Sequence, residues 1–229
     1  SGDHVEMANL ESVSPDKTAY REYLRGIDLL RRGEQHHILS AIKRFETATM
    51  IDPNFSVAYA AMCRAYLERY RISNATNEYD MAQQNCQQAL RLNERQSDVQ
   101  LAQAELYRTS GDTDLARYHY TKLLELDARS ADANMGLADI FAQEGNYQSA
   151  EALYLKATHL RPSYWKAQNQ LGSFYFRQGL YFQAMESYLR VTQLTTANAT
   201  ALNNLGAAQY YAGHFDQAYQ SWLKASQLS

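Results

Sequence analysis

The sequence predicts an all-α protein, an α-solenoid of six helix pairs, because three kinds of residue return every 34 positions. A glycine marks each period in the second half of the chain, an alanine follows it by five residues, and an aromatic residue follows the alanine by four. The glycines are Gly111, Gly145, Gly179 and Gly213, the alanines are Ala116, Ala150, Ala184 and Ala218, and the aromatic residues are Tyr120, Tyr154, Tyr188 and Trp222. This period is typical of a unit of two packed helices, and such units must stack because one pair cannot bury its own apolar faces.

Each of the three positions has a physical role in a helix pair. The glycine can adopt the left-handed conformation with which a first helix ends. The alanine lies where the second helix crosses the first, since a larger side chain would push the two apart. The aromatic side chain fills the space around that crossing. The pattern therefore specifies two helices and the turn between them.

The period, the turn and the residue types resemble the tetratricopeptide repeat over nearly the whole chain. The resemblance implies a right-handed superhelical α-solenoid of six such helix pairs. Residues 1–18 are expected to form an N-terminal tail or linker, and residues 19–229 the repeat array. The repeats are expected at about 19–55, 56–96, 97–130, 131–164, 165–198 and 199–229.

The first two repeats depart from the regular spacing. Small residues of the two helices in a regular repeat are 12 residues apart, as Gly172 and Ala184 are. The corresponding separation is 15 residues in the first repeat and 19 in the second. We expect the additional residues to lengthen the connections between helices, around residues 34–37 and within 70–81.

Composition and motifs argue against several functional classes. The formal net charge of −3 and the 21% of charged residues do not match the basic footprint of a nucleic-acid-binding protein. No run of 18 apolar residues exists, so no membrane span is expected. The sequence has no glycine-rich phosphate loop, GxSxG, HExxH or CxxC, and the adjacent His36 and His37 project in different directions. We therefore expect no enzyme activity, no catalytic residues, no metal and no cofactor.

The two cysteines, Cys63 and Cys86, take facing positions in the helices of the second repeat. A disulfide between them is geometrically conceivable. The alternative is a pair of buried thiols, since free cysteine usually behaves as a small buried hydrophobic residue. The compartment decides between the two states, and the sequence leaves bacterial cytoplasm and periplasm both open.

The resemblance to tetratricopeptide repeats implies a concave wall of first helices, with ligand contacts at the second, fifth, sixth, ninth, twelfth and thirteenth positions of each repeat. In the last two repeats the peptide-binding residues that it implies are Lys166, Asn169, Gln170, Arg177, Asn203, Asn204, Tyr210 and Tyr211. The same positions include Phe176, and Glu105, Arg108 and Asp139 in earlier repeats. Amide side chains both donate and accept hydrogen bonds, so they can hold an extended peptide backbone whatever its sequence. We expect a protein or peptide partner.

The last predicted helix carries apolar side chains that no later helix covers. These are Tyr219, Trp222, Leu223 and Leu228. An exposed apolar patch usually marks a partner or a missing piece of chain, so we expect self-association through this helix or burial by residues beyond 229. The chain opens with Ser1 rather than Met, and we expect a fragment of a longer protein.

The first repeat adds a narrower resemblance. Its sequence AYREYLRGIDLLRR, followed after a turn by AIKRFETATMIDPNF, is similar to the opening of tetratricopeptide arrays in bacterial signalling proteins: membrane-spanning winged-helix activators, adenylate cyclases and Ser/Thr kinases. This implies a protein- or peptide-binding scaffold that forms the sensory or partner-binding part of a larger bacterial protein. Two alternatives stay open, an assembly factor for a pilus or secretion machine and a sensor domain of a transcription regulator that responds to a small effector.

Overall fold

The computed structural model describes residues 16–32, 35–196 and 198–228, and these residues form an all-α solenoid of six helix pairs with no strand. The first helices of the pairs are α1 (Lys17–Arg32), α3 (Ser56–Ser73), α5 (Ser97–Ser110), α7 (Ala131–Gln143), α9 (Trp165–Arg177) and α11 (Ala199–Tyr211). The second helices are α2 (Gln35–Ile51), α4 (Thr76–Leu92), α6 (Thr113–Leu126), α8 (Tyr147–Leu160), α10 (Tyr181–Leu194) and α12 (Phe215–Ser226). Each predicted repeat holds one pair. The predicted tail, apart from Asp16, Lys17 and Thr18, lies outside the described residues.

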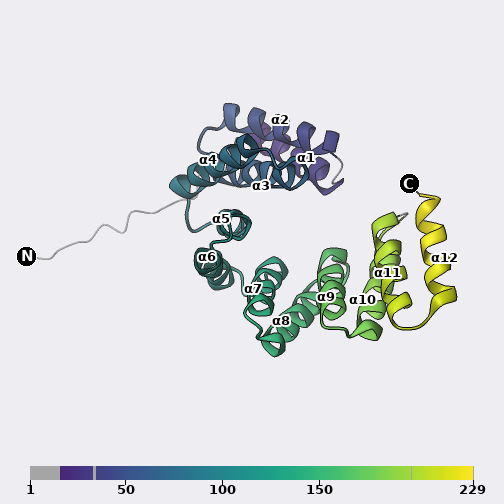
Figure 1. The fold of residues 1–229 in the computed structure, drawn as a ribbon. Coiled ribbons are helices and arrows are strands. Elements are labelled where there is room, and N and C mark those ends of the chain that lie inside the picture. Colours follow the sequence, from purple (N-terminus) through teal and green to yellow (C-terminus); the bar gives the residue numbers. More distant parts are fainter. Residues whose placement is uncertain (1–15, 33–34, 197, 229) are drawn as a thin grey trace, which may run out of the picture. The chain divides into compact units, whose positions relative to one another are not determined.

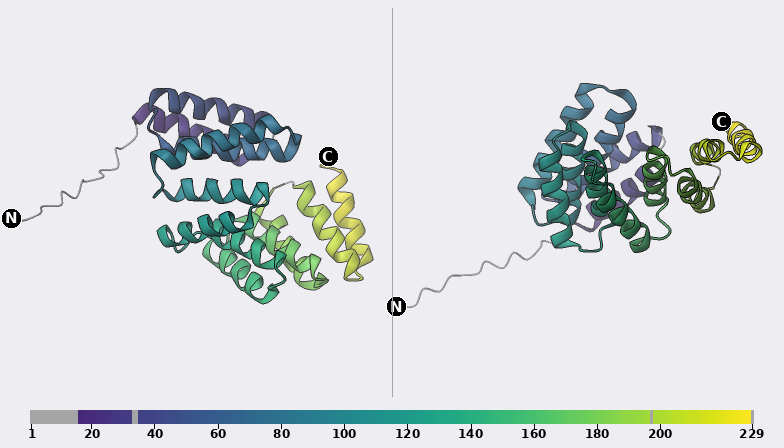
Figure 2. Two further views of the ribbon diagram at one scale, coloured as in Figure 1. Left: turned by 60° about the vertical axis from the view of Figure 1, so that its left-hand side comes forward. Right: turned by 60° about the horizontal axis from the view of Figure 1, so that its bottom comes forward.

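The chain divides into two compact units between Ala102 and Gln103, within α5. Unit 1 contains α1 to α4 and the start of α5, and unit 2 contains the rest of α5 and α6 to α12. In unit 2 the helices follow one another as antiparallel neighbours in chain order (Figure 1). In unit 1 the four long helices lie side by side, as both further views show (Figure 2).

The turns of unit 2 are built as the 34-residue pattern predicts. The four recurring glycines have φ between 74° and 85°, which is the left-handed conformation that ends a helix without steric cost only at glycine. A side chain then caps the next helix in two of these four turns. Asp112 accepts from the backbone N–H of Leu115 at 3.1 Å, and Asn146 accepts from that of Ser149 at 3.2 Å.

The core of unit 2 lies at the helix crossings. The recurring alanines are fully buried, which allows the paired helices to approach closely. Around them pack the aromatic residues of the pattern, with Tyr154 and Tyr188 both buried, and Phe174 5.3 Å from Tyr154 between ring centroids. This packing holds α9 and α11 in the positions on which the candidate site depends.

The additional residues of the first two repeats lengthen the helices, so the prediction of longer connections is wrong. The four helices α1 to α4 contain 16, 17, 18 and 17 residues, whereas α5 to α12 contain 12 to 14. Only Asn74 and Ala75 separate α3 from α4, and Asn74 ends α3 in the left-handed conformation at φ 52°. Additional helical turns can pack against each other along their full length, which a long loop cannot do.

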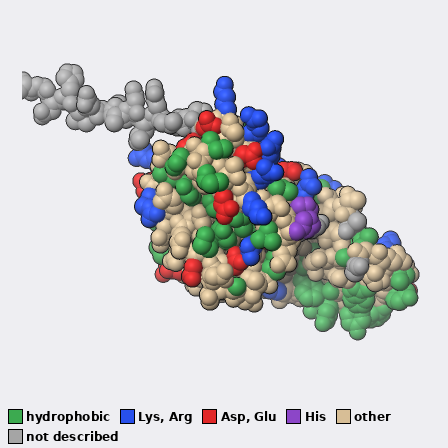
Figure 3. All heavy atoms as spheres, turned by 90° about the horizontal axis from the view of Figure 1, so that it is seen from above, with side chains coloured by type: hydrophobic (Ala, Val, Ile, Leu, Met, Phe, Trp, Pro, Cys, Tyr) green, Lys and Arg blue, Asp and Glu red, His purple; other side chains and the backbone are tan. Residues whose placement is uncertain are grey.

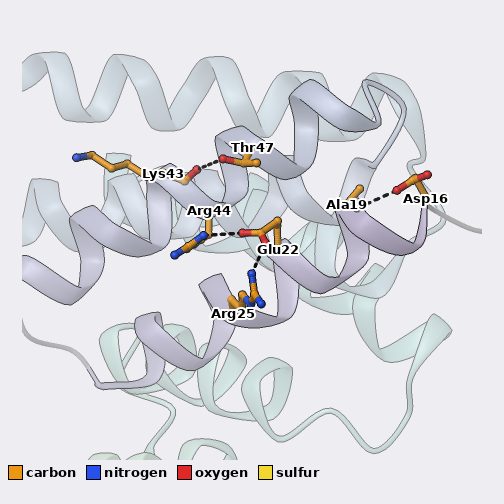
Figure 4. A network of polar contacts seen from close by, with 7 residues as sticks. All are labelled: Asp16, Ala19, Glu22, Arg25, Lys43, Arg44 and Thr47. Carbon is orange, nitrogen blue, oxygen red and sulfur yellow. Dashed lines mark hydrogen bonds and ion pairs between the residues drawn. The ribbon is translucent and has the colours of Figure 1, made fainter.

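A buried carboxylate fastens α1 to α2 (Figure 4). The side chain of Glu22 is 10% exposed and accepts hydrogen bonds from the guanidinium groups of Arg25, at 2.5 Å, and Arg44, at 2.9 Å. Burial by itself would raise the pKa of Glu22, but the bonds and charges of Arg44 and Arg25 hold this pKa below its ordinary value. Asp16 caps α1 by accepting from the backbone N–H groups of Thr18 and Ala19.

No helix in the described part of the chain combines the length and the apolar composition that crossing a bilayer requires.

Candidate functional site

Two asparagine side chains join the first helices of the fifth and sixth repeats. Asn204 of α11 donates through Nδ2 to Oδ1 of Asn169 in α9, at 3.3 Å. The neighbouring side chain, Asn203, is exposed, and the backbone carbonyl of this residue accepts from Nε1 of Trp222 at 3.3 Å. Two of the predicted binding residues therefore meet between α9 and α11 with a third beside them, and their amides retain unused donors and acceptors.

Six aromatic side chains from four helices form a continuous surface that we call the aromatic ridge. They are Phe176 of α9, Tyr181 of α10, Tyr210 and Tyr211 of α11, and Phe215 and Trp222 of α12. Tyr211 is central, with its ring centroid 5.5 Å from that of Phe176, 5.1 Å from that of Tyr181 and 5.6 Å from that of Tyr210. Tyr210 continues the contact to Phe215 at 5.3 Å and to Trp222 at 5.9 Å.

The aromatic ridge is accessible to a ligand. Tyr210 and Tyr211 are 48% and 58% exposed, which is high for side chains that also make several ring contacts. Hydrophobic side chains gather at the end of the molecule formed by α11 and α12, on the right in Figure 3. Because residues seven apart share a face of a helix, Tyr210 and Tyr211 lie on the same face of α11 as Asn203 and Asn204.

The remaining predicted residues of α9 differ in their surroundings. Lys166 is exposed in the first turn of the helix. Gln170 is half-buried, and its Oε1 accepts no hydrogen bond from the described residues although water does not reach it. A buried acceptor without a donor costs about 1–3 kcal/mol. The site thus contains an acceptor that the protein itself does not use.

Arg177, the last of the predicted residues, has partners within the protein. Its charge acts on Tyr154 in α8 and on Asp139 in α7, and the hydroxyl of Tyr154 donates to Oδ1 of Asp139. Burial raises the pKa of Asp139 above its ordinary value, and Tyr154, Arg108 and Arg177 act against that rise. Arg177 therefore contributes to a structural network as well as to the surface that a ligand would meet.

A second arginine extends this network along the first helices. The guanidinium group of Arg108 in α5 interacts electrostatically with Tyr120 in α6, and the charges of Asp139 and Glu105 also act on it. Burial alone would lower the pKa of Arg108, but Tyr120, Asp139 and Glu105 raise it. The residues Arg108, Asp139 and Arg177 come from α5, α7 and α9, so positive and negative charges alternate from one repeat to the next.

Two clefts lie between second helices of unit 2, away from the predicted binding residues. One, of about 690 Å³, is lined by residues of α8, α9 and α10 that include Leu171, Glu186 and Arg190. The other, of about 420 Å³, is lined by residues of α10, α11 and α12 that include Gln217 and Gln220. Their linings mix apolar groups with charges of both signs, so neither is selective for one kind of ligand.

The 34-residue pattern and the helix pairs agree with a match to a known family. The model of the tetratricopeptide repeat family matches residues 101–164 and 145–199. Residues 101–199 consist of tetratricopeptide repeats. The matched residues include α9 and α10, which carry half of the candidate site.

Solved structures of other proteins share the fold of this chain at low sequence identity. PilF of Pseudomonas aeruginosa is 17% identical, with a TM-score of 0.64 over 93% of this chain and 92% of that one. PilW, a widely conserved type IV pilus biogenesis factor, is also 17% identical, with a TM-score of 0.66 over 90% and 91%. A tetratricopeptide repeat protein of the thermophile Thermus thermophilus is 17% identical, with a TM-score of 0.70 over 84% and 99%.

The similarity to these three structures shows a shared fold and nothing about function. No curated protein sequence matches the chain.

The positions counted along the first helices do not include several residues of the site. Tyr181 and Phe215 belong to second helices, so counting along the first helices could not find them. They do carry a periodic signal, because both stand two residues after a recurring glycine. Tyr120 and Tyr154 were recognised as core residues, but the hydroxyl group of Tyr154 also donates to Asp139.

In the structure a disulfide joins Cys63 of α3 to Cys86 of α4, with 5.2 Å between the Cα atoms. Both residues are fully buried. This bond ties together two of the long helices of unit 1.

Part of the apolar patch predicted on the last helix is in contact with other residues of the protein itself. Tyr219, Leu223 and Leu228 are exposed on α12 or just after it. Trp222 instead packs into the aromatic ridge, through Tyr210 and the carbonyl of Asn203. Self-association through this helix stays a prediction.

Proposed function

We propose that this chain is a binding scaffold that holds an extended segment of a protein partner along α9 and α11. The observation that carries the proposal is the combination of asparagine side chains and exposed tyrosine rings on one face of α11. Asn203 and Asn204 offer hydrogen bonds to a peptide backbone, while Tyr210 and Tyr211 offer apolar area.

The internal contacts of the site support this proposal. The bond from Asn204 to Asn169 fixes the amides before a ligand arrives, so less side-chain freedom is lost on binding. The same role suits the sensory or partner-binding part of a larger bacterial protein, which the resemblance of the first repeat suggests.

The test begins with peptides selected from a random dodecamer display library on the immobilised chain. Their affinities are measured by fluorescence anisotropy for the wild-type chain and for the double variant Asn203→Ala/Asn204→Ala. Loss of about two hydrogen bonds should weaken binding at least tenfold. Circular dichroism establishes that the variant stays folded.

A matched control removes two amides from another face. Gln217→Ala/Gln220→Ala acts on exposed side chains of α12 that line the smaller cleft, and it should leave the affinities unchanged. Peptides that respond to this control and not to the asparagine variant would overturn the proposal.

A second candidate is an assembly factor for a pilus. It is favoured by the shared fold with PilF and PilW, which extends over at least nine-tenths of this chain and of each neighbour. Deleting the gene in the source organism should then abolish surface pili, and normal piliation would remove this candidate.

A further inference from the structure

One aromatic contact occurs twice in the candidate site, one repeat apart. Phe176 and Tyr181 meet edge to face, with ring centroids 5.4 Å apart and planes at 67°. Tyr210 and Phe215, 34 residues later, meet with centroids 5.3 Å apart and planes at 68°. The ridge is therefore a periodic surface with two equivalent aromatic pairs.

The distance between the two pairs is set by Tyr211, which contacts both. The ring contacts of Tyr211 with Phe176 and with Tyr210 place the centroids of those two rings no more than about 11 Å apart. A polyproline II helix presents the same face every three residues, or about every 9 Å. Prolines at positions i and i+3 of such a segment would thus meet one aromatic pair each.

The chemistry of the ridge favours the same ligand. Tyrosine rings pack against pyrrolidine rings, and their hydroxyl groups can donate to the carbonyl groups that a proline-rich backbone exposes. An extended β-strand would need a free strand edge to pair its backbone, and the described residues contain only helices. A polyproline II segment keeps its backbone solvated and needs no such edge.

The uncharged helix α11 favours a neutral ligand. The helix that supplies Tyr210 and Tyr211, α11, contains no Asp, Glu, Lys or Arg. An acidic or basic peptide would gain nothing from this helix and would lose part of its hydration on binding. The uncharged surface is thus suited to a proline-rich segment flanked by neutral residues.

We infer that the aromatic ridge binds a polyproline II segment with prolines at i and i+3, the two aromatic pairs each receiving one proline. This inference rests on the proposed function, because it names the kind of peptide that the same surface holds. It assigns a binding role to Tyr181 and Phe215, which lie outside the first helices.

The experiment measures binding of fluorescein-labelled decaproline and of a labelled Gly-Ser decamer to the chain by fluorescence anisotropy. Decaproline should bind and the Gly-Ser peptide should not. In an alanine background, a peptide with prolines three residues apart should bind more tightly than one with prolines four residues apart. Tyr211→Ala should weaken decaproline binding about fivefold, which is the size of one aromatic contact.

The matched control is Tyr118→Ala. Tyr118 is 54% exposed, much as Tyr211 is, but lies on α6. This control should leave the decaproline affinity unchanged. Decaproline binding that is equally insensitive to Tyr211→Ala and Tyr181→Ala would overturn the inference.

The display-selected peptides separate this inference from the proposed function. If those peptides bind and respond to Asn203→Ala/Asn204→Ala while decaproline does not bind, the scaffold function holds and the polyproline assignment is wrong. If no selected peptide depends on the asparagines and decaproline also fails to bind, the proposed function itself is wrong.

Discussion

Tyr181 and Tyr211 stack with their ring centroids 5.1 Å apart and their planes 24° from parallel. Tyr181 begins α10 and Tyr211 ends α11, so the contact crosses from the fifth repeat to the sixth. The turn glycines Gly179 and Gly213 lie two residues from these tyrosines. The turn geometry of the repeats therefore creates the aromatic ridge.

The stacked pair should be coupled energetically. A double-mutant cycle with Tyr181→Ala and Tyr211→Ala should give an interaction energy of about 0.5–1.5 kcal/mol, which is typical of aromatic pairs. Urea unfolding of the four proteins measures it. Additive effects of the two substitutions would show that the rings do not stabilise each other.

Tyr154→Phe should be more costly than Tyr188→Phe, although the two tyrosines are equivalent in the repeat. The hydroxyl of Tyr154 donates to the buried carboxylate of Asp139, so its removal should cost about 1.5–3 kcal/mol. The hydroxyl of Tyr188 pairs with the neutral Oγ of Ser173 at 3.0 Å, and its loss should cost about 1 kcal/mol. Urea unfolding measures the loss of stability in each variant. Equal losses would show that the charge of Asp139 does not strengthen the hydrogen bond of Tyr154.

Two glycines inside helices should respond differently to alanine. A Cβ at Gly136 would overlap the ring of Tyr120, which is buried and has little room to move. A Cβ at Gly206 would lie 2.6 Å from Nε1 of Trp222, whose ring is 39% exposed and can move outward.

Gly136→Ala should therefore destabilise the protein by about 2 kcal/mol, because overpacking outweighs the helix propensity of alanine. Gly206→Ala should change stability by less than about 1 kcal/mol, since propensity offsets the milder overlap. The midpoint of thermal unfolding checks both, and the reverse order would contradict the packing described.

Reduction should destabilise unit 1. The bond between Cys63 and Cys86 closes a loop with a sequence separation of 23. Such a bond reduces the entropy that the chain gains on unfolding, and this stabilises the folded state by about 3 kcal/mol. Thermal unfolding with and without a phosphine reductant measures the change. The variant Cys63→Ala/Cys86→Ala is the control and should not respond to reductant, whereas a wild-type chain that also fails to respond would carry two buried thiols.

Glu22→Gln should make stability less dependent on pH in the acid range. The pKa of Glu22 is held below its ordinary value of 4.5, so the carboxylate stabilises the folded state above that pH. The arginine partners are about half exposed, so the substitution should cost only about 1 kcal/mol at pH 7.

The difference in the free energy of unfolding between the wild-type chain and Glu22→Gln should shrink as the pH falls through 4.5 and then through the lowered pKa. At such pH the wild-type side chain is protonated and uncharged, as the glutamine side chain always is. Urea unfolding at about pH 7, 5 and 3 measures it. A constant difference across this range would show that the ion pairs do not account for the effect.

The sequence determined the helix pairs, their turns and the crossing alanines, because these depend on local rules of backbone conformation and side-chain size. The glycines with positive φ and the buried alanines stand where the 34-residue pattern placed them. Position counting placed Asn169 and Asn204 on the first helices of neighbouring repeats, whereas the hydrogen bond between them is visible only in the structure.

Only the tertiary structure decided the rest. The extra residues of the first two repeats extend the helices, because the longer helices are stabilised by packing against their neighbours. The spacing of residues along the sequence does not contain this packing energy. The ring contact of Tyr181 with Tyr211 and the hydrogen bond from Tyr154 to Asp139 depend on the angles at which neighbouring helices pack. Side chains that meet between helices are brought together by helix packing, and a period read along one chain does not contain that information.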